Sequence, residues 1–176
     1  MKLTIAGLFC CAALYLPSLA QNTSGAGGTS DQDFVTLAAQ TDMAEANLGQ
    51  LAETNASSQG VKDLAQMLVT DHTSDYNQIT TVATKAGLTV PKGLDKTHEK
   101  MSLMFQKLKG AAFDHRYVAE MVKGHEAAIA AYDKEARDGQ NADLKAYAKN
   151  TLPTLEKHRT AAQALVKGGG AKKTAS

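Results

Sequence analysis

Residues 68–79, LVTDHTSDYNQI, decide the fold because they carry an apolar stripe with the spacing of an α-helix. Leu68 and Ile79 belong to that stripe, and helical spacing places His72 and Asp75 on it between them. Burying an isolated carboxylate is strongly unfavourable unless it is paired, protonated or bound to a metal. The stretch therefore predicts a long helix that directs an imidazole and a carboxylate into a helical core.

The surrounding sequence predicts three more long helices. Residues 31–167 are rich in Ala, Leu, Lys, Glu and Gln and contain no strand-like run, which is typical of an all-α domain. Capping and stop residues suggest where each helix begins and ends. The expected ranges are residue 30 or 31 to about 55, residue 57 or 58 to Gly87, about 113 to Gly139, and about 141 to 167 with Pro153 inside.

The connections between these helices differ in length. The first pair and the second pair are each joined by a tight turn, so each pair is predicted to form an antiparallel hairpin. Residues 88–112 separate the two hairpins and contain a short helical piece, LDKTHEKMSLMFQKL (94–108). Two hairpins joined by one long crossover predict a ferritin-like four-helix bundle.

The first twenty residues predict export, and the segments at both ends of the helical domain are predicted to be unstructured. Residues 1–20, MKLTIAGLFCCAALYLPSLA, have the lysine, short apolar run and small residues of a secretory signal cleaved near Ala20. Residues 21–30 are predicted to be a flexible linker, and residues 168–176 a disordered basic tail. We therefore expect a periplasmic or otherwise exported protein whose mature form has no membrane span.

Cysteine and charge narrow the possible functions. Both cysteines, Cys10 and Cys11, lie in the predicted signal, so the mature chain has no thiol for catalysis, disulfides or zinc binding. Without Lys2 the mature chain has 18 basic and 18 acidic residues, which argues against a nucleic-acid partner. Nucleophile-elbow, phosphate-loop and dinucleotide motifs are absent, and no catalytic residue is predicted.

Each predicted apolar stripe is interrupted near its middle by a titratable residue. In the first helix the stripe contains Phe34, Leu37, Thr41, Glu45, Leu48 and Ala52. Glu45 interrupts this stripe, and a histidine interrupts each of the others. The full set of candidate site residues is Glu45, His72, Asp75, His125 and His158.

Three interpretations of this set remain open, one of which is that most of these groups are exposed at the surface. The residues can bind a transition-metal ion, for which imidazole and carboxylate together suit Fe, Mn, Zn or Cu. Alternatively, they can form a metal-free buried polar network that fixes the register of the helices. A copper site of Met and His is a further alternative, because His98, Met101 and Met104 share helical spacing.

Several segments resemble a known bacterial family. They are AEANLGQLA (44–52), MLVTDH (67–72), FDHRYVAEMVKGHEAAI (113–129) and LKAYAKNTLPTLEKH (144–158). They are similar to the exported family known as the domain of unknown function numbered 4142, over about residues 31–167. The resemblance implies a ferritin-like fold, an outer-membrane or periplasmic location, and motif positions at Glu45, Asp71, His72, His125 and His158.

The sequence departs from di-iron ferritin-like proteins, which use Glu-x-x-His on two helices. Here the corresponding spacings are His72-x-x-Asp75 and Leu155-x-x-His158. A mononuclear or vestigial site is therefore expected rather than an iron-oxidising centre. The expected partner is a metal ion or an unidentified protein of the cell envelope.

Overall fold

The computed structural model describes residues 30–171, which form five α-helices and no β-strand. The helices are α1 (Asp31–Asn55), α2 (Gln59–Lys85), α3 (Lys96–Gln106), α4 (Gly110–Asp138) and α5 (Ala142–Ala171). The prediction of an all-α domain is therefore confirmed. The predicted signal peptide, residues 21–29 of the linker and residues 172–176 lie outside the described part of the chain.

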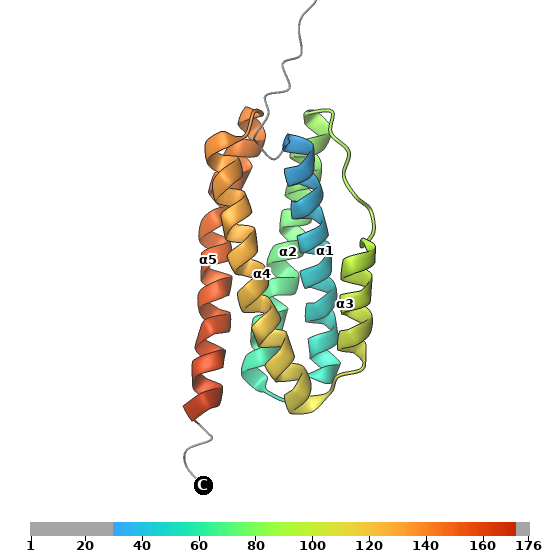
Figure 1. Cartoon of the computed structure of the whole chain (residues 1–176), viewed down its shortest axis with the longest axis vertical. Helices are drawn as coiled ribbons and strands as arrows, with labels where there is room; N and C mark the ends of the chain where they lie inside the picture. The colour runs from blue at the N-terminus through green and yellow to red at the C-terminus, as the bar shows by residue number, and fades with distance from the viewer. Residues whose placement is uncertain (1–29, 172–176) are drawn as a thin grey trace, which may run out of the picture.

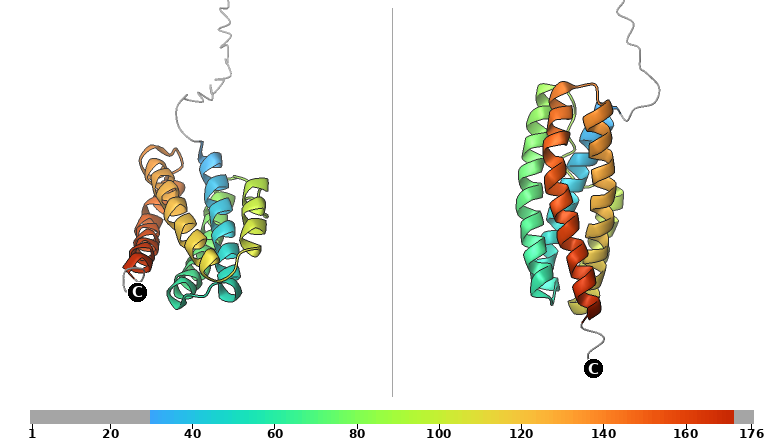
Figure 2. Two further views of the ribbon diagram at one scale, coloured as in Figure 1. Left: turned by 60° about the horizontal axis from the view of Figure 1, so that its bottom comes forward. Right: turned by 90° about the vertical axis from the view of Figure 1, so that its left-hand side faces the viewer.

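The four long helices lie side by side, with neighbours running in opposite directions (Figures 1 and 2). The hairpin partners α1 and α2 contact each other, as do α4 and α5, and further contacts join α1 to α4 and α2 to α5. The short helix α3 packs on the outer side of α1. No described helix is both long enough and apolar enough to cross a bilayer.

Two helix ends differ from the sequence-based expectation. The helix expected to begin near Phe113 begins at Gly110, whose positive φ of 60° lets the chain turn sharply out of the preceding segment. The last helix continues to Ala171 instead of ending at about Lys167. Pro153 lies inside α5 as expected, on its exposed side, where the loss of one backbone hydrogen bond leaves a carbonyl that water can reach.

The crossover between α2 and α4 is tied to α1 by side chains. Gln32 donates to the carbonyl of Thr89 and accepts from its backbone N–H. Gln40 likewise donates to the carbonyl of Gly93 and accepts from the N–H of Asp95. These paired bonds hold a long connection that has few backbone partners of its own.

The core consists of two apolar clusters separated by a polar layer. Along α2, Leu68 belongs to the first cluster and Ile79 to the second, with His72 and Asp75 between them. The other long helices repeat this order. The flanking pairs are Leu48 and Ala38 on α1, Met121 and Ala128 on α4, and Ala162 and Leu155 on α5. The polar residues that interrupt the apolar stripe of each long helix therefore lie at one level and form a single layer between the two clusters.

The start of α2 is capped by a side chain from another helix. Ser58 is the N-cap residue, but its side chain makes no capping hydrogen bond. Instead, the Asp114 carboxylate in α4 accepts from the backbone N–H groups of Ser57 and Ser58, at 3.0 and 2.9 Å. The Ser57 hydroxyl also donates to this carboxylate.

Replacing Asp114 with alanine should therefore lower the unfolding free energy by about 1–2 kcal/mol, the usual loss when a helix cap is removed. Chemical denaturation followed by circular dichroism measures this change. Asp138→Ala, an exposed aspartate at the end of the same helix, is the control and should change stability by less than about 0.5 kcal/mol. Equal losses in the two variants would contradict the capping role.

Candidate metal centre

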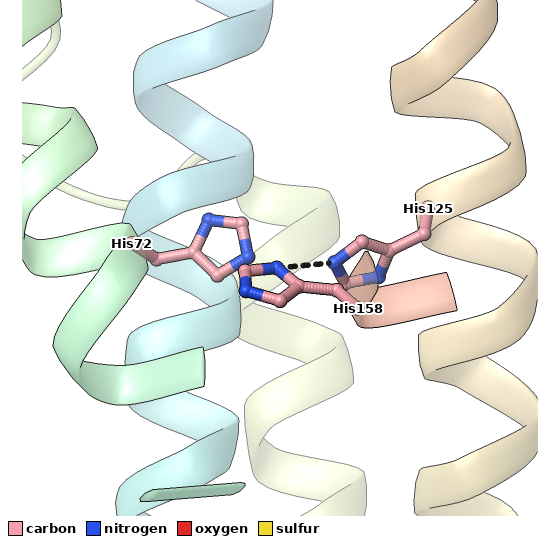
Figure 3. Close-up of side chains that lie close together, drawn as sticks. All are labelled: His72, His125 and His158. Atoms are coloured by element: carbon pink, nitrogen blue, oxygen red, sulfur yellow. Dashed lines mark hydrogen bonds between the residues drawn. The ribbon is translucent and has the colours of Figure 1, made fainter. Parts of the chain in front are cut away.

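Three fully buried imidazole rings from three different helices meet in the polar layer (Figure 3). His72 comes from α2, His125 from α4 and His158 from α5. Their ring centroids lie 5.2–5.6 Å apart, and one ring nitrogen from each lies within 4.8 Å of the other two. Glu45 Oε2, from α1, lies 3.0 Å from His72 Nε2 and 3.4 Å from His125 Nε2, so the four predicted residues lie together in this layer.

The protonated nitrogen of His125 is fixed by a backbone carbonyl. Its Nδ1 lies 2.9 Å from the carbonyl oxygen of Met121, which can only accept a hydrogen bond. The proton is therefore assigned to Nδ1, and the neutral ring presents an unprotonated Nε2 to the centre of the layer. Burial holds the pKa of His125 below its ordinary value, so the ring is neutral near pH 7.

His158 is oriented in the same way by a carboxylate. Its Nε2 donates to Asp71 Oδ2 at 2.8 Å, while its Nδ1 lies 3.2 Å from His125 Nε2. Burial lowers the pKa of His158 to about 4, so the ring carries one proton at neutral pH. A carboxylate is the stronger acceptor for that proton. The contact between the two rings then joins two lone pairs, which is unfavourable without a cation.

His72 lies between two carboxylates. Its Nδ1 is hydrogen-bonded to Asp42 Oδ1 at 2.8 Å, and its Nε2 lies 3.0 Å from Glu45 Oε2. Burial alone would lower the pKa of His72, but the two carboxylates outweigh it and raise that pKa to about 10. In the metal-free protein His72 is therefore a buried imidazolium between two anions.

Glu45 Oε2 approaches two rings without a directed hydrogen bond to either. It lies 3.0 Å from His72 Nε2 and 3.4 Å from His125 Nε2. Both Glu45 Oε2 and His72 Nε2 are buried, and within residues 30–171 neither has a hydrogen-bond partner of acceptable geometry. The two atoms form a close ion pair, but they are not aligned for a hydrogen bond.

Three of the distances between these donors are close to the edge length of a tetrahedral metal site. With metal–ligand bonds of about 2.0–2.1 Å, neighbouring ligand atoms lie about 3.3 Å apart. The three measured edges are 3.0, 3.2 and 3.4 Å, and they join the four candidate atoms in a continuous chain. Those atoms are His72 Nε2, His125 Nε2, His158 Nδ1 and Glu45 Oε2. The three histidines therefore form a group that can hold a metal ion, and Glu45 lies beside two of them as a further candidate ligand.

Asp75 lies on the far side of His72 rather than among the three rings. It forms a second potential ligand group with Asp42 and His72, whose ligand atoms lie within 4.8 Å of one another. Sequence reasoning missed Asp42 because it placed Leu37 and Thr41 on the core stripe of the first helix. Leu37 is 39% exposed, whereas Asp42 is buried and lies three residues before Glu45 on the same face. That three-residue spacing was the signal that could have identified it.

The Met and His residues of the crossover do not join the site. Met101 and Met104 pack against the first apolar cluster, and His98 Nδ1 lies 3.0 Å from Asp95 in its own helix. No group of three potential ligands in the described chain contains His98. These methionines therefore fill space beside the core.

A small pocket of about 190 Å³ is lined by residues of α1, α3 and α4, including Glu45, His98 and Met101. Gly124 lies in its wall, where a Cβ atom would come within 3.2 Å of Glu45 Oε1. The missing side chain leaves room for the carboxylate of Glu45. The pocket therefore brings one side of Glu45 close to the surface.

A family model described as Domain of unknown function (DUF4142) matches residues 16–165. The chain belongs to this family. No curated protein and no solved structure shows a significant match to the chain. Family membership therefore carries no named activity, and chemical conclusions must come from the buried site.

The metal-free protein should lose stability as pH rises from 7.5 to 9. An unfolded histidine titrates near pH 6.5, whereas the pKa of His72 in the fold is about 10. The folded state holds the extra proton in this interval, so the stabilisation is complete below about pH 6.5 and decreases as pH rises toward 10. Denaturant titrations in the presence of chelator measure this slope.

His72→Gln should make the unfolding free energy less dependent on pH between 7.5 and 9. The substitution removes the side chain whose pKa differs between the folded and unfolded states. His98→Gln, at the surface beside Asp95, should keep the slope of the unaltered protein. An unchanged slope in His72→Gln would show that His72 is not an imidazolium in the metal-free fold.

Proposed function

We propose that the chain binds one divalent transition-metal ion at the centre of its helical domain. The ligands are His72 Nε2, His125 Nε2, His158 Nδ1 and Glu45 Oε2. One observation carries the proposal, namely the direction of the outer ring nitrogens. They point to Asp42, to the Met121 carbonyl and to Asp71, so that the inner nitrogens converge with Glu45.

This pattern is the usual outer shell of a protein metal site. Histidines that bind metals donate their second ring N–H to a carboxylate or carbonyl, which fixes the ring and increases its basicity. A histidine that only fills a core needs one such partner. It does not require two neutral rings to expose lone pairs to the same point beside an anion.

The donor set limits the kind of ion. Three imidazoles and one carboxylate suit Zn, Fe, Mn or Cu and disfavour Ca and Mg, which prefer oxygen ligands. The described residues contain no cysteine, so thiolate chemistry does not contribute. Four protein ligands fill a tetrahedral site, which favours storage, transfer or a structural role over catalysis.

The wider role that we propose is metal handling or stress tolerance in an exported, ferritin-like four-helix bundle. The antiparallel helix pairs, the long crossover and the central polar layer support this classification. The signal-like residues 1–20 support export to the periplasm or another exported compartment. A metal ion is then the primary partner, and no reaction needs to be assigned.

A metal-free structural domain of the cell envelope is the second candidate. The His72 imidazolium joins α2 to α1 through Asp42 and Glu45, and the bond from His158 to Asp71 joins α5 to α2. These contacts fix the register of three helices without any ion. Ion-dependent stability separates the two candidates.

Adding the preferred ion should raise the melting temperature of the chelator-treated protein. Only the folded state assembles the site, and binding at 100 times Kd stabilises it by about 2.7 kcal/mol. The shift should decrease as pH falls, because protons compete for the imidazoles. Melts with Zn, Mn, Fe(II) and Cu at pH 6–8, on protein purified without an affinity tag, provide the measurement.

Glu45→Gln should remove most of this ion-dependent shift, because an amide is neutral and a much weaker ligand. Glu156→Gln, an exposed glutamate on α5, should retain it. If no ion changes the melting temperature of the unaltered protein at any pH in this range, the metal-binding proposal fails and the structural candidate stands.

Asp71→Asn tests the outer shell separately. Asp71 is hydrogen-bonded to the outer nitrogen of His158 and is not one of the four proposed ligands, so the neutral amide should weaken metal affinity by about 10–100-fold while keeping those ligands. Competition with a chromophoric chelator measures the affinity. Asp63→Asn, an exposed aspartate on the same helix, should leave it unchanged. If the site is a metal-free network, the two variants should show no difference in metal affinity.

A further inference from the structure

Asp42 and Asp75 lie on the Nδ1 side of His72, away from the four proposed ligand atoms. Their one link to that centre is the hydrogen bond between His72 Nδ1 and Asp42 Oδ1. Asp42 is 2% exposed and Asp75 is 8% exposed. Within residues 30–171, no donor reaches Asp42 Oδ2 or Asp75 Oδ2, although both atoms are buried. Buried anionic oxygens without a partner are strongly unfavourable, which points to a cation that they share.

We propose that Asp42, Asp75 and His72 Nδ1 form a second binding site for a divalent transition-metal ion. One ligand atom from each of the three residues lies within 4.8 Å of the other two. The ion takes the place of the proton on Nδ1, and the His72 ring then bridges two ions. The proposal rests on the proposed function, because the two sites share this ring.

The environment of the second site differs from that of the first. Asp75 borders an open groove of about 690 Å³ between α2 and α5, which is also lined by Gln78, Tyr147 and Thr151. Gln78 donates to Asp75 Oδ1 and leaves Oδ2 free. Three protein ligands beside a groove leave a position for water, whereas the inner ion has four protein ligands.

The two ions would lie roughly 6 Å apart, given metal–nitrogen bonds of about 2.0–2.1 Å on both sides of one imidazole. Their mutual repulsion makes the outer ion the weaker one. One nitrogen and two carboxylate donors suit Zn, Mn, Fe(II) or Cu(II). The outer ion should therefore bind second and be removed first by a chelator.

Native mass spectrometry of the full chain titrated with Zn tests this site by stoichiometry. The unaltered protein should bind two ions, and Asp75→Asn should bind one with the higher affinity retained. His125→Gln, which alters only the inner site, should also lose one ion. Asp63→Asn, an exposed aspartate on α2, should still bind two.

The outcomes separate the two proposals. One ion in the unaltered protein, or two ions in Asp75→Asn, overturns the second site and leaves the inner site standing. No bound ion overturns both. If Asp75→Asn does not fold, electron paramagnetic resonance of the unaltered protein with two equivalents of Cu(II) decides. Coupled spins at roughly 6 Å support the shared ring, whereas two uncoupled spectra overturn it.

Discussion

The compensation of buried negative charge is the constraint on which this domain depends. Asp42, Glu45, Asp71 and Asp75 surround three imidazoles that are fully buried, and burial disfavours the anionic form of Asp42, Glu45 and Asp75. Burial outweighs the effect of His72 on Asp42 and raises its pKa to about 6. For Glu45, burial alone would raise the pKa, but the charge of His72 holds it below its ordinary value. The charge of His72 therefore outweighs burial at Glu45 but only partly offsets it at Asp42.

The same layer gives the helices a fixed axial position. Apolar contacts are not directional, so the two clusters of alanine, leucine and aromatic side chains tolerate sliding of one helix along another. The bonds between His72 and Asp42 and between His158 and Asp71 tolerate much less, because they have defined lengths and directions. A shift of one helical turn would separate every pair in the layer and leave buried charges unpaired. The polar residues therefore specify the register, while the apolar clusters provide most of the favourable burial.

Most of the helical architecture could be predicted from the sequence because helix signals are local. Ser30, Gly87 and Gly139 marked helix ends, and the long segment before residue 113 separated the two hairpins.

The site was only partly predictable. Four residues on the stripes indicated convergence, but choosing Leu37 as a core residue rotated the predicted face and hid Asp42. The carbonyl of Met121 had no sequence signal, because backbone groups become ligands or acceptors only through the fold. The cap from Asp114 to α2 was missed for the same reason, since its partners lie 56 and 57 residues away.

The proposed structural and metal-binding roles of the site would meet one electrostatic requirement in two ways. In the metal-free protein, the second proton of His72 occupies Nε2, the same atom that faces Glu45 Oε2 at 3.0 Å. A divalent ion at this point would replace that proton and add positive charge where Glu45 and the two neutral rings expose lone pairs. If the ion left, the proton on His72 Nε2 would restore part of its positive charge beside Glu45. A purely structural metal site lacks such a substitute and unfolds when its ion is removed. A site that stays folded in both states can release and rebind its ion, and this property suits metal handling better than permanent structural binding.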